Sequence, residues 1–291
     1  MRVTDFRMLE VAMSKVMQSR ERAQSAADVA SGGQKVSLPS QDLAAWSDGV
    51  RARTRKTMSE ARGQAITRAR DRLVQLDSAF ADLQNILGRT TELGVQLTNA
   101  PISGGDRISA ATELRSLQAS ALALVNARGP DGEFLLAGSR GTQQPFTSPS
   151  TYSGDALTRT IETGEGAQLV VSLPGTVLTA VGGVDVLGVL ETMSLALEQN
   201  NVPNLRAALD TLNSGVDQLA QAHAQVGSRM RALDEADGYR QQFELNLAAL
   251  EQRSMEGDQV AAVSEMMQAK VALENSQAMA TAMNKLVQAG G

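Results

Sequence analysis

The sequence contains no cysteine, and this absence excludes several kinds of site at once. Without thiols the chain can form no disulfide, no thiolate-bound zinc or iron–sulfur centre and no cysteine nucleophile. Its only histidine is His223, which excludes a metal centre built from several histidines and makes any Ser–His–Asp triad depend on that residue. The glycine-rich phosphate-binding motifs are also missing. We therefore predict no catalytic residues, no metal site and no cofactor.

Aromatic residues are scarce as well, because the 291-residue chain has one Trp, two Tyr and five Phe. Large cores are normally anchored by aromatic side chains, which bury roughly 150–250 Å² each. A chain of this length is long enough for two domains. Because it has so few aromatic residues, its core must be narrow and built from small residues. We expect helices that pack side by side.

The charge balance gives the chain no general attraction to polyanions. With 27 basic and 32 acidic residues its formal net charge is −5, which does not favour nucleic acid or an anionic membrane surface. The longest uncharged run, residues 166–184, contains Pro174 and four glycines and is too polar to cross a bilayer as a helix. We predict no nucleic-acid partner and no membrane insertion. No secretory signal is visible, because charged residues interrupt the N-terminal segment (Arg2, Asp5, Arg7 and Glu10).

Apolar and small residues recur with alternating spacings of three and four in five stretches of the chain. This spacing keeps one narrow line of residues on one face of a helix, as in bundles and coiled coils. We call such a line a contact line. The five predicted contact lines lie in residues 6–30, 66–87, 110–124, 205–233 and 262–287.

The middle of the chain has a different composition. Residues 129–188 hold eleven of the 25 glycines and four of the seven prolines, and the turn sequence Gly129-Pro130-Asp131-Gly132 begins this region. Short β-prone runs follow at 133–138, 158–161 and 168–173, whose pairing the sequence leaves open. The sequence thus predicts a mainly α fold, an elongated antiparallel helical bundle or coiled coil formed by N- and C-terminal arms, with a small inserted β-rich domain.

These patterns also give domain boundaries. We expect terminal helical arms at 1–40 and 256–291, a helical bundle from 41–128 and 189–255, and the β-rich insert at 129–188. The first helix should end at Ser31-Gly32-Gly33, and Ser40 and Asp42 should begin a helical run that continues to Asn99. Whether this run is one helix or breaks near Gly63 stays open, because glycine disfavours a helix interior.

Two polar features have a functional and a structural interpretation. His223 could be a general base, but it falls on the fourth contact line and no motif places a nucleophile beside it, so we interpret it as a helix-interface residue. The group Arg51, Arg53, Arg55 and Lys56 could bind an anion. It has no interleaved aromatic residues, so we interpret it as a solvated helix face.

The two ends of the chain point to assembly. From 258 to 291 there are only five charged residues, and apolar residues occur on more than one helix face. A pair of arms joined through Ala, Met and Ser buries little area, while ordering the backbone costs ~1–2 kcal/mol per residue. We expect arms that are labile in the isolated chain and are ordered by partners. The predicted assembly interface consists of Phe6, Leu9, Met13, Val16, Met266, Leu273, Met283 and Val287.

Several segments resemble one protein family. Residues 31–42 resemble the loop after the first helix in the flagellin superfamily. Asn126, residues 132–139, 144–146 and 152–155 are similar to a stretch of its hook–filament junction proteins of the FlgL type, and Val226-Gly227-Ser228-Arg229 resembles a Gly-small-Arg segment of the returning helix. The chain also ends without the Leu-rich terminus typical of filament flagellins, which favours a junction protein.

The resemblance implies a structural, non-enzymatic subunit of the bacterial flagellum that links the hook to the flagellin filament. It implies export through the flagellar type III apparatus without a cleaved signal peptide, with the help of a chaperone, and an extracellular position. Its partners would be the first hook-associated protein, flagellin and copies of itself in a ring. The alternatives are filament flagellin itself and a cytoplasmic coiled-coil signalling or scaffold protein; a hydrolase that uses Ser and His223 is more remote.

Overall fold

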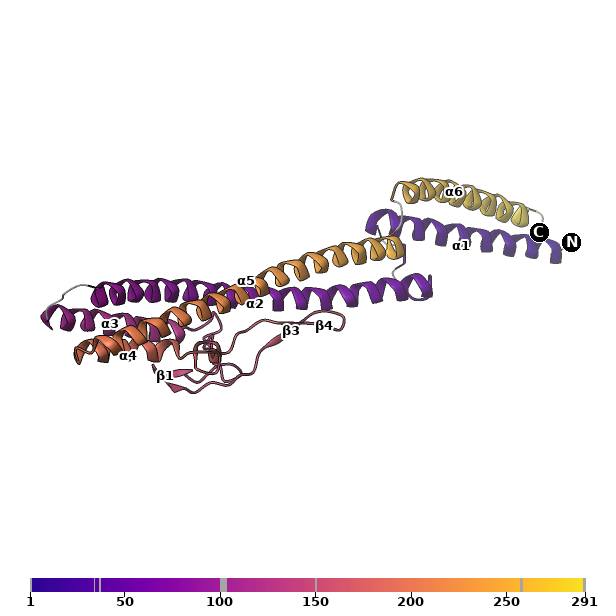
Figure 1. The fold of residues 1–291 in the computed structure, drawn as a ribbon. Coiled ribbons are helices and arrows are strands. Elements are labelled where there is room, and N and C mark those ends of the chain that lie inside the picture. Colours follow the sequence, from indigo (N-terminus) through magenta and orange to yellow (C-terminus); the bar gives the residue numbers. More distant parts are fainter. Residues whose placement is uncertain are drawn as a thin grey trace. The chain divides into compact units, whose positions relative to one another are not determined.

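The computed structural model describes residues 2–33, 35–36, 38–99, 104–149, 151–256 and 259–289. Within them the chain forms two compact units, one from residues 1–58 and 243–291 and the other from residues 59–242. The expected mainly α fold with a small β region is confirmed (Figure 1). The described helices are α1 (Arg2–Gly32), α2 (Leu43–Asn99), α3 (Gly104–Val125), α4 (Val186–Glu198), α5 (Val202–Met255) and α6 (Gln259–Ala289).

The helix ends follow local signals in the sequence. Helix α1 ends at Gly32, and the next residue, Gly33, takes a positive φ of 70° while its N–H donates to the Val29 carbonyl. This left-handed turn favours glycine, as predicted. Helix α2 begins after Asp42, whose carboxylate accepts a hydrogen bond of 3.0 Å from the N–H of Ala45. The predicted cap at Ser40 is wrong, because Asp42 is the residue that reaches the free N–H groups of the first turn.

Helix α2 runs without a break through Gly63 to Asn99, a length of 57 residues. The sequence also predicts helix starts at Asp106, at Asp185 and at Asn201 or Val202. Helix α3 begins at Gly104, two residues before the predicted start, whereas α4 and α5 are capped by the predicted side chains. Asp185 accepts from the N–H of Gly188 at the start of α4, and Asn201 accepts from that of Asn204 at the start of α5. The sequence also predicts that Pro101 stops the helical run and that Gly257-Asp258 ends one helix and caps the next, and these residues lie outside the described ones.

The core of the unit 59–242 lies where helices α2 to α5 meet. Polar contacts show that α2 and α5 run antiparallel here, because Arg70 pairs with Asp234 while Arg206, further back along α5, donates to the Thr98 carbonyl. The predicted contact line at 66–87 is completely buried, with Leu87 at 0% exposure. Its partners are the buried leucines and valine of α5 together with α3 and α4. The apolar spacing in the sequence therefore identified this core.

Two antiparallel hairpins form the β region. Strand β1 (Phe146–Ser148) pairs with β2 (Thr151–Tyr152), and β3 (Thr160–Gly164) pairs with β4 (Ala167–Val170) in a register that places Ile161 opposite Leu169. The second hairpin overlaps two of the runs that the sequence marked as β-prone, 158–161 and 168–173. The first hairpin was not expected from the sequence.

The β-prone run at 133–138 does not form a strand. It contributes one isolated bridge between Phe134 and Arg128, while Leu135, Leu136 and Ala137 are buried in irregular structure. The backbone of this run bonds to several separate segments, since the Phe134 N–H donates to Gly141 and the Leu135 N–H to Ala127. An apolar run indicates burial, but only a neighbouring strand makes it a strand.

The turn that precedes this run forms as its sequence predicts. Gly132 has a φ of 77° and donates to the Gly129 carbonyl, and the Asp131 carboxylate accepts from the N–H of Glu133. The turn is held to α2 by Arg72, whose guanidinium donates to Asp131 and to the Phe134 carbonyl. It therefore ties the insert to the bundle.

Asn126 joins the end of α3 to the first hairpin. Its side-chain amide donates to the Phe146 carbonyl at 2.9 Å and accepts from the Phe146 N–H at 3.0 Å, and it also donates to the Leu122 carbonyl. A side-chain amide has a donor and an acceptor side by side, so it replaces the partner that a neighbouring strand would supply. This explains why Asn stands at a position that the family resemblance singled out.

Tyr152 connects three separate backbone segments. Its hydroxyl lies 2.9 Å from the Leu136 carbonyl and 2.8 Å from the Asp155 carbonyl, and it accepts a hydrogen bond from the Gly175 N–H. The ring is half-buried and lies against Phe146, with 5.1 Å between the ring centroids. One phenol thus fixes how three segments of the insert pack.

We predict that Tyr152→Phe destabilises the unit 59–242 by about 1–3 kcal/mol, because the change removes the hydroxyl that bonds to the Asp155 carbonyl, while the Gly175 N–H and the Leu136 carbonyl still bond to each other. Urea unfolding followed by circular dichroism would measure the loss. Tyr239→Phe is the matched control, since Tyr239 is 79% exposed, and it should change stability by less than about 0.5 kcal/mol. Equal effects of the two changes would contradict the prediction.

The titration of Tyr152 gives a second prediction. Burial raises the pKa of Tyr152 to about 12. Because this folded-state pKa lies above the ordinary value of about 10, the neutral phenol stabilises the fold fully below pH ~10 and this contribution is lost as the pH rises through about 12. In Tyr239→Phe protein Tyr152 is the only tyrosine. Its phenolate absorbance should therefore titrate well above that of the same protein unfolded in urea, and coincident curves would contradict this assignment.

Candidate assembly surface

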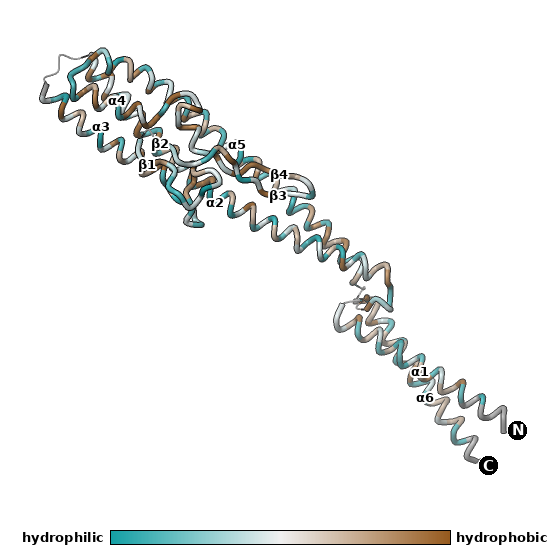
Figure 2. The backbone as a smooth tube through the Cα atoms, turned by 90° about the horizontal axis from the view of Figure 1, so that it is seen from below, coloured by the Kyte–Doolittle hydropathy of each residue, from teal (hydrophilic) through white to brown (hydrophobic). Residues whose placement is uncertain are grey.

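Helices α1 and α6 form an antiparallel pair within the unit 1–58 and 243–291. The two helices lie side by side in both views, with the chain ends at the same end of the pair (Figures 1 and 2). The Ser19 and Ser276 hydroxyls are 3.4 Å apart across the contact, and the fully buried residues beside it are the alanines Ala26, Ala262 and Ala269. Small side chains allow the two backbones to approach closely, but they bury little apolar area.

The contact line of α1 differs by one residue from the predicted line in two places. Ala12 and Ser19 face the partner helix where the spacing predicted Met13 and Arg20, both of which are exposed. On α6 the predicted line from Ala262 to Met283 is buried or half-buried throughout. A line of small residues is hard to place from spacing alone, because alanine and serine fit both faces of such a helix.

The predicted interface residues are divided by this geometry. Val16, Met266, Leu273 and Met283 are half-buried at or beside the contact between α1 and α6, whereas Met13 is 59% exposed and points away from it. The side chains of Phe6, Leu9 and Val287 lie outside the described residues. The role of this set in assembly stays a prediction.

The outer faces of the pair carry large apolar side chains. Met17 is 75% exposed, Val260 81% and Met267 62%. Large apolar side chains that are exposed on a soluble protein are candidates for contact with another protein. The exposed apolar surface, a name we keep below, consists of Val11, Met13, Met17, Val260, Val263, Met267, Val271 and Met279. Of these residues, only Met13 belongs to the assembly interface that was predicted from the spacing. The others are identified by their exposure in the structure.

A groove of about 340 Å³ lies along the pair. Its walls include Val11 of α1 and Met279 and Met283 of α6, and two basic residues, Arg7 and Lys15, also line it. The methionine side chains are flexible and adapt to the shape of an apolar partner. The pair can therefore accept an apolar segment flanked by negative charge.

The segment with the flagellin-superfamily resemblance connects the arms to the long helices. The N–H groups of Lys35 and Val36 both donate to the Met255 carbonyl at the end of α5, at 2.7 and 3.2 Å. Val36 and Met255 are buried. These contacts attach the start of the loop to the end of α5. The residues that resemble the flagellin superfamily therefore hold two segments of the chain together.

His223 lies between α5 and α2. Its Nε2 is 2.8 Å from the Asp77 carboxylate, its Nδ1 is 3.2 Å from the Gln84 side-chain oxygen, and its ring meets Phe80 edge to face. All three partners belong to α2. The interpretation of His223 as a helix-interface residue is confirmed.

The basic group near the start of α2 also has a structural partner. Arg53 forms two hydrogen bonds of 3.0 and 2.8 Å to Glu251 of α5, and both side chains are reached by solvent. An exposed pair of this kind contributes little to stability. Among the described residues, no helix is long and apolar enough to cross a membrane.

The comparisons with known proteins give a consistent result. No protein-family model matches the sequence. The chain is 24% identical over 261 residues to flagellar hook-associated protein 3 of Salmonella typhimurium, an alignment that covers 81% of this chain and 82% of that protein.

Two solved structures share the fold. The crystal structure of Bacillus cereus FlgL matches with a TM-score of 0.60 at 18% identity and covers 69% of this chain and 98% of that one. The flagellar junction protein FlgL from Legionella pneumophila matches with a TM-score of 0.55 at 14% identity, covering 63% and 98%. The resemblance to FlgL-type proteins that the sequence motifs indicated is confirmed.

We predict that α1 and α6 exchange their amide hydrogens much faster than the core stretches 66–87 and 205–233 in the isolated protein. The buried residues of the arms are mainly alanines, whereas those of the core are mainly leucines, so the arms lose less burial when they open. Hydrogen exchange followed by mass spectrometry measures both regions in one sample. Equal protection of arms and core would contradict the prediction.

Proposed function

We propose that this chain is a structural, non-enzymatic subunit of the bacterial flagellum, of the FlgL type, at the junction that links the hook to the flagellin filament. The observation that carries the proposal is the similarity to flagellar hook-associated protein 3, which extends over about four fifths of both chains. The shared fold with FlgL structures supports it. In this position the protein would lie outside the cell, on the flagellum.

The partners that we propose are those that the family resemblance implies. The first hook-associated protein, flagellin and further copies of this chain in a ring would cover the exposed apolar surface of α1 and α6. Full burial of one Met or Val side chain contributes roughly 1.5–3 kcal/mol. Several such side chains on each subunit offset the cost of ordering two weakly held arms.

The insert has a different role in this proposal. Its hairpins are fixed to the bundle by Arg72, Asn126 and Tyr152, so it needs no partner to become ordered. We place the paired arms in the inner layers of the tube and the insert on its outside. The subunit then adapts one tubular lattice to the next by packing alone, without a chemical step.

Export fits the same properties. A chain without cysteine cannot become cross-linked before it passes through the type III export apparatus, and weakly held arms are available to a chaperone before assembly. We propose that the protein uses this route without a cleaved signal peptide. Filament flagellin is the nearest alternative function, and copy number separates the two, because a junction ring needs few subunits and a filament needs many.

We predict that deleting the gene leaves cells with hooks that carry no filament, while flagellin is released into the medium. Complementation with Met17→Asp or Met267→Asp protein should fail or give few filaments, because each change places a charge on the exposed apolar surface. Electron microscopy of the cells and immunogold labelling of purified hook–basal bodies measure both outcomes.

Val181→Asp is the matched control. Val181 is 84% exposed and belongs to the unit 59–242, whereas α1 and α6 belong to the other unit, so this variant should restore filaments to the wild-type number. The Asp variants must reach the medium in normal amounts, which separates failed assembly from failed export. A deletion strain that still carries full filaments would overturn the proposed function.

A further inference from the structure

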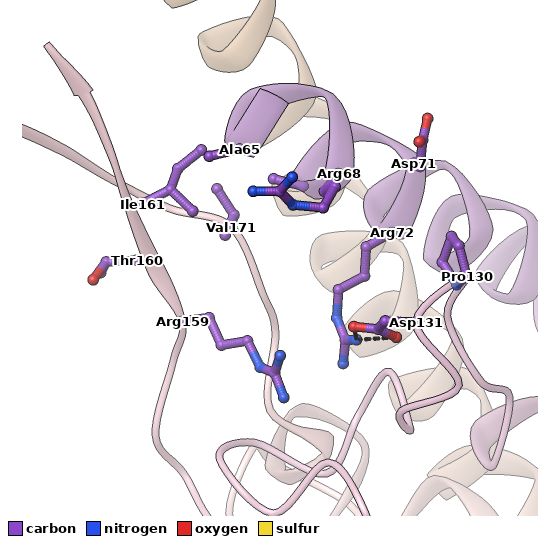
Figure 3. Close-up of a pocket in the computed structure, with 11 residues that line it drawn as sticks. Ala65, Arg68, Asp71, Arg72, Pro130, Asp131, Arg159, Thr160, Ile161 and Val171 are labelled. Carbon is purple, nitrogen blue, oxygen red and sulfur yellow. Dashed lines mark hydrogen bonds and ion pairs between the residues drawn. The ribbon is translucent and has the colours of Figure 1, made fainter. Parts of the chain in front are cut away.

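A cavity of about 680 Å³ lies in the unit 59–242, between helix α2 and the segment that leads into strand β3. Figure 3 shows its lining. Side chains of α2 form one wall, Pro130 and Asp131 of the turn form another, and Arg159 and Ile161 lie opposite α2. The proposed assembly function does not use this cavity.

Three guanidinium groups surround the open space in Figure 3, those of Arg68, Arg72 and Arg159. Arg72 is only 6% exposed. One of its terminal nitrogens bonds to Asp131 and the other to the Phe134 carbonyl, but its buried Nε has no hydrogen-bond partner. A buried donor without a partner is unfavourable, but solvent does not reach this Nε, so a ligand in the cavity meets the other arginines first.

Arg68 and Arg159 have donors to spare. Arg68 is exposed and makes no ion pair or side-chain hydrogen bond among the described residues. Arg159 pairs with Glu133 through one terminal nitrogen, which leaves most of its five N–H donors for another acceptor. The two side chains extend toward the same space from opposite walls.

The carboxylates near the cavity bond to Arg72 and to one nitrogen of Arg159, and in the described part of the chain they leave Arg68 and the other donors of Arg159 without an acceptor. Asp131 already accepts from Arg72 and from the N–H of Glu133, and Glu133 accepts from Arg159. Asp71 is exposed at the lining. With three guanidinium groups and two carboxylates, the lining keeps a formal charge of +1, so an anion would bind through directed hydrogen bonds more than through net charge.

The rest of the lining is apolar. Ile161 of β3 and Val171, which follows β4, lie near Ala65 of α2 in Figure 3, and Ala69 of α2 also lines the cavity. An inorganic anion would leave these side chains uncovered, whereas an aliphatic chain would pack against them. Guanidinium groups bind carboxylates through parallel N–H donors.

We propose that this cavity binds a carboxylate carried on a short aliphatic chain. The carboxylate accepts hydrogen bonds from Arg68 and Arg159, and the aliphatic part lies against Ile161 and Val171. The same chemistry is present in a free dicarboxylic acid and in a glutamate side chain of another protein. The experiment distinguishes the two sources.

The test uses the full chain with isotope-labelled isoleucine methyl groups, because Ile161 lines the cavity while Ile108 is 62% exposed and belongs to α3. Glutarate and the blocked peptide Ala-Glu-Ala are each titrated at constant, low ionic strength. The Ile161 methyl signal should shift in a saturable way and the Ile108 signal should not. Saturation by glutarate alone identifies a free acid as the ligand, and saturation by the peptide identifies an acidic side chain.

Two variants test the arginines. Arg68→Ala should weaken binding about tenfold, the loss expected for one charged hydrogen bond. It should fold normally, because Arg68 is exposed and has no partner to lose. Arg231→Ala on α5 removes the same charge from an exposed site outside the cavity and should change the affinity by less than about twofold.

Three results would overturn the proposal. The first is the absence of a saturable Ile161 shift with both ligands. The second is an equal effect of the blocked peptide Ala-Gln-Ala, which carries no charge. The third is an unchanged affinity in Arg68→Ala. None of these results bears on filament assembly, so the proposed function stands or falls separately.

Discussion

The apolar contact between α2 and α5 in the unit 59–242 is the interaction on which the rest of that unit depends. With so few aromatic residues, its core is a column of leucine, valine and alanine that continues from Ile66 to Leu87 and from Leu205 to Leu233. Helices α3 and α4 widen this column and do not begin a second core. A narrow core needs long helices to bury enough area, which explains why α2 and α5 have 57 and 54 residues.

The insert is attached to this column by polar groups. Arg72 and Arg229 donate to backbone carbonyls of the insert. Asn126, at the end of α3, and Tyr152, inside the insert, also donate to its backbone carbonyls. Burial lowers the pKa of Arg72 and of Arg229, which reflects the cost of placing charged side chains at this boundary. The Ser172, Leu136 and Asp155 carbonyls lie outside the strands, where a neighbouring strand does not supply the donor. The small hairpins therefore rest on side-chain contacts more than on sheet hydrogen bonds.

The terminal helices use the opposite arrangement. In the core unit the large apolar residues face inward, whereas in the arms the alanines and serines face inward and several methionines and valines face solvent. The contact between α1 and α6 is therefore weak, and the exposed apolar side chains of the pair are available to bind another protein. This arrangement suits a subunit that is exported first and becomes rigid only when neighbours cover it, as the proposed function requires.

The sequence by itself determined much of the local structure. The contact line at 66–87, the end of α1 at Gly32 and the turn at 129–132 were all predicted, because spacing, capping and turn chemistry are properties of a few neighbouring residues. The domain boundaries and the assembly interface inferred in the same way stay predictions.

The tertiary structure decided the rest. It made 133–138 a buried irregular segment, placed Ala12 in the contact line where spacing predicted Met13, and brought Arg68 and Arg159 to one cavity from positions far apart in the chain. The reason is physical. A hydrogen-bond partner or a covered face is supplied by a distant segment, and the spacing of residues along one helix or strand carries no information about which segment that is.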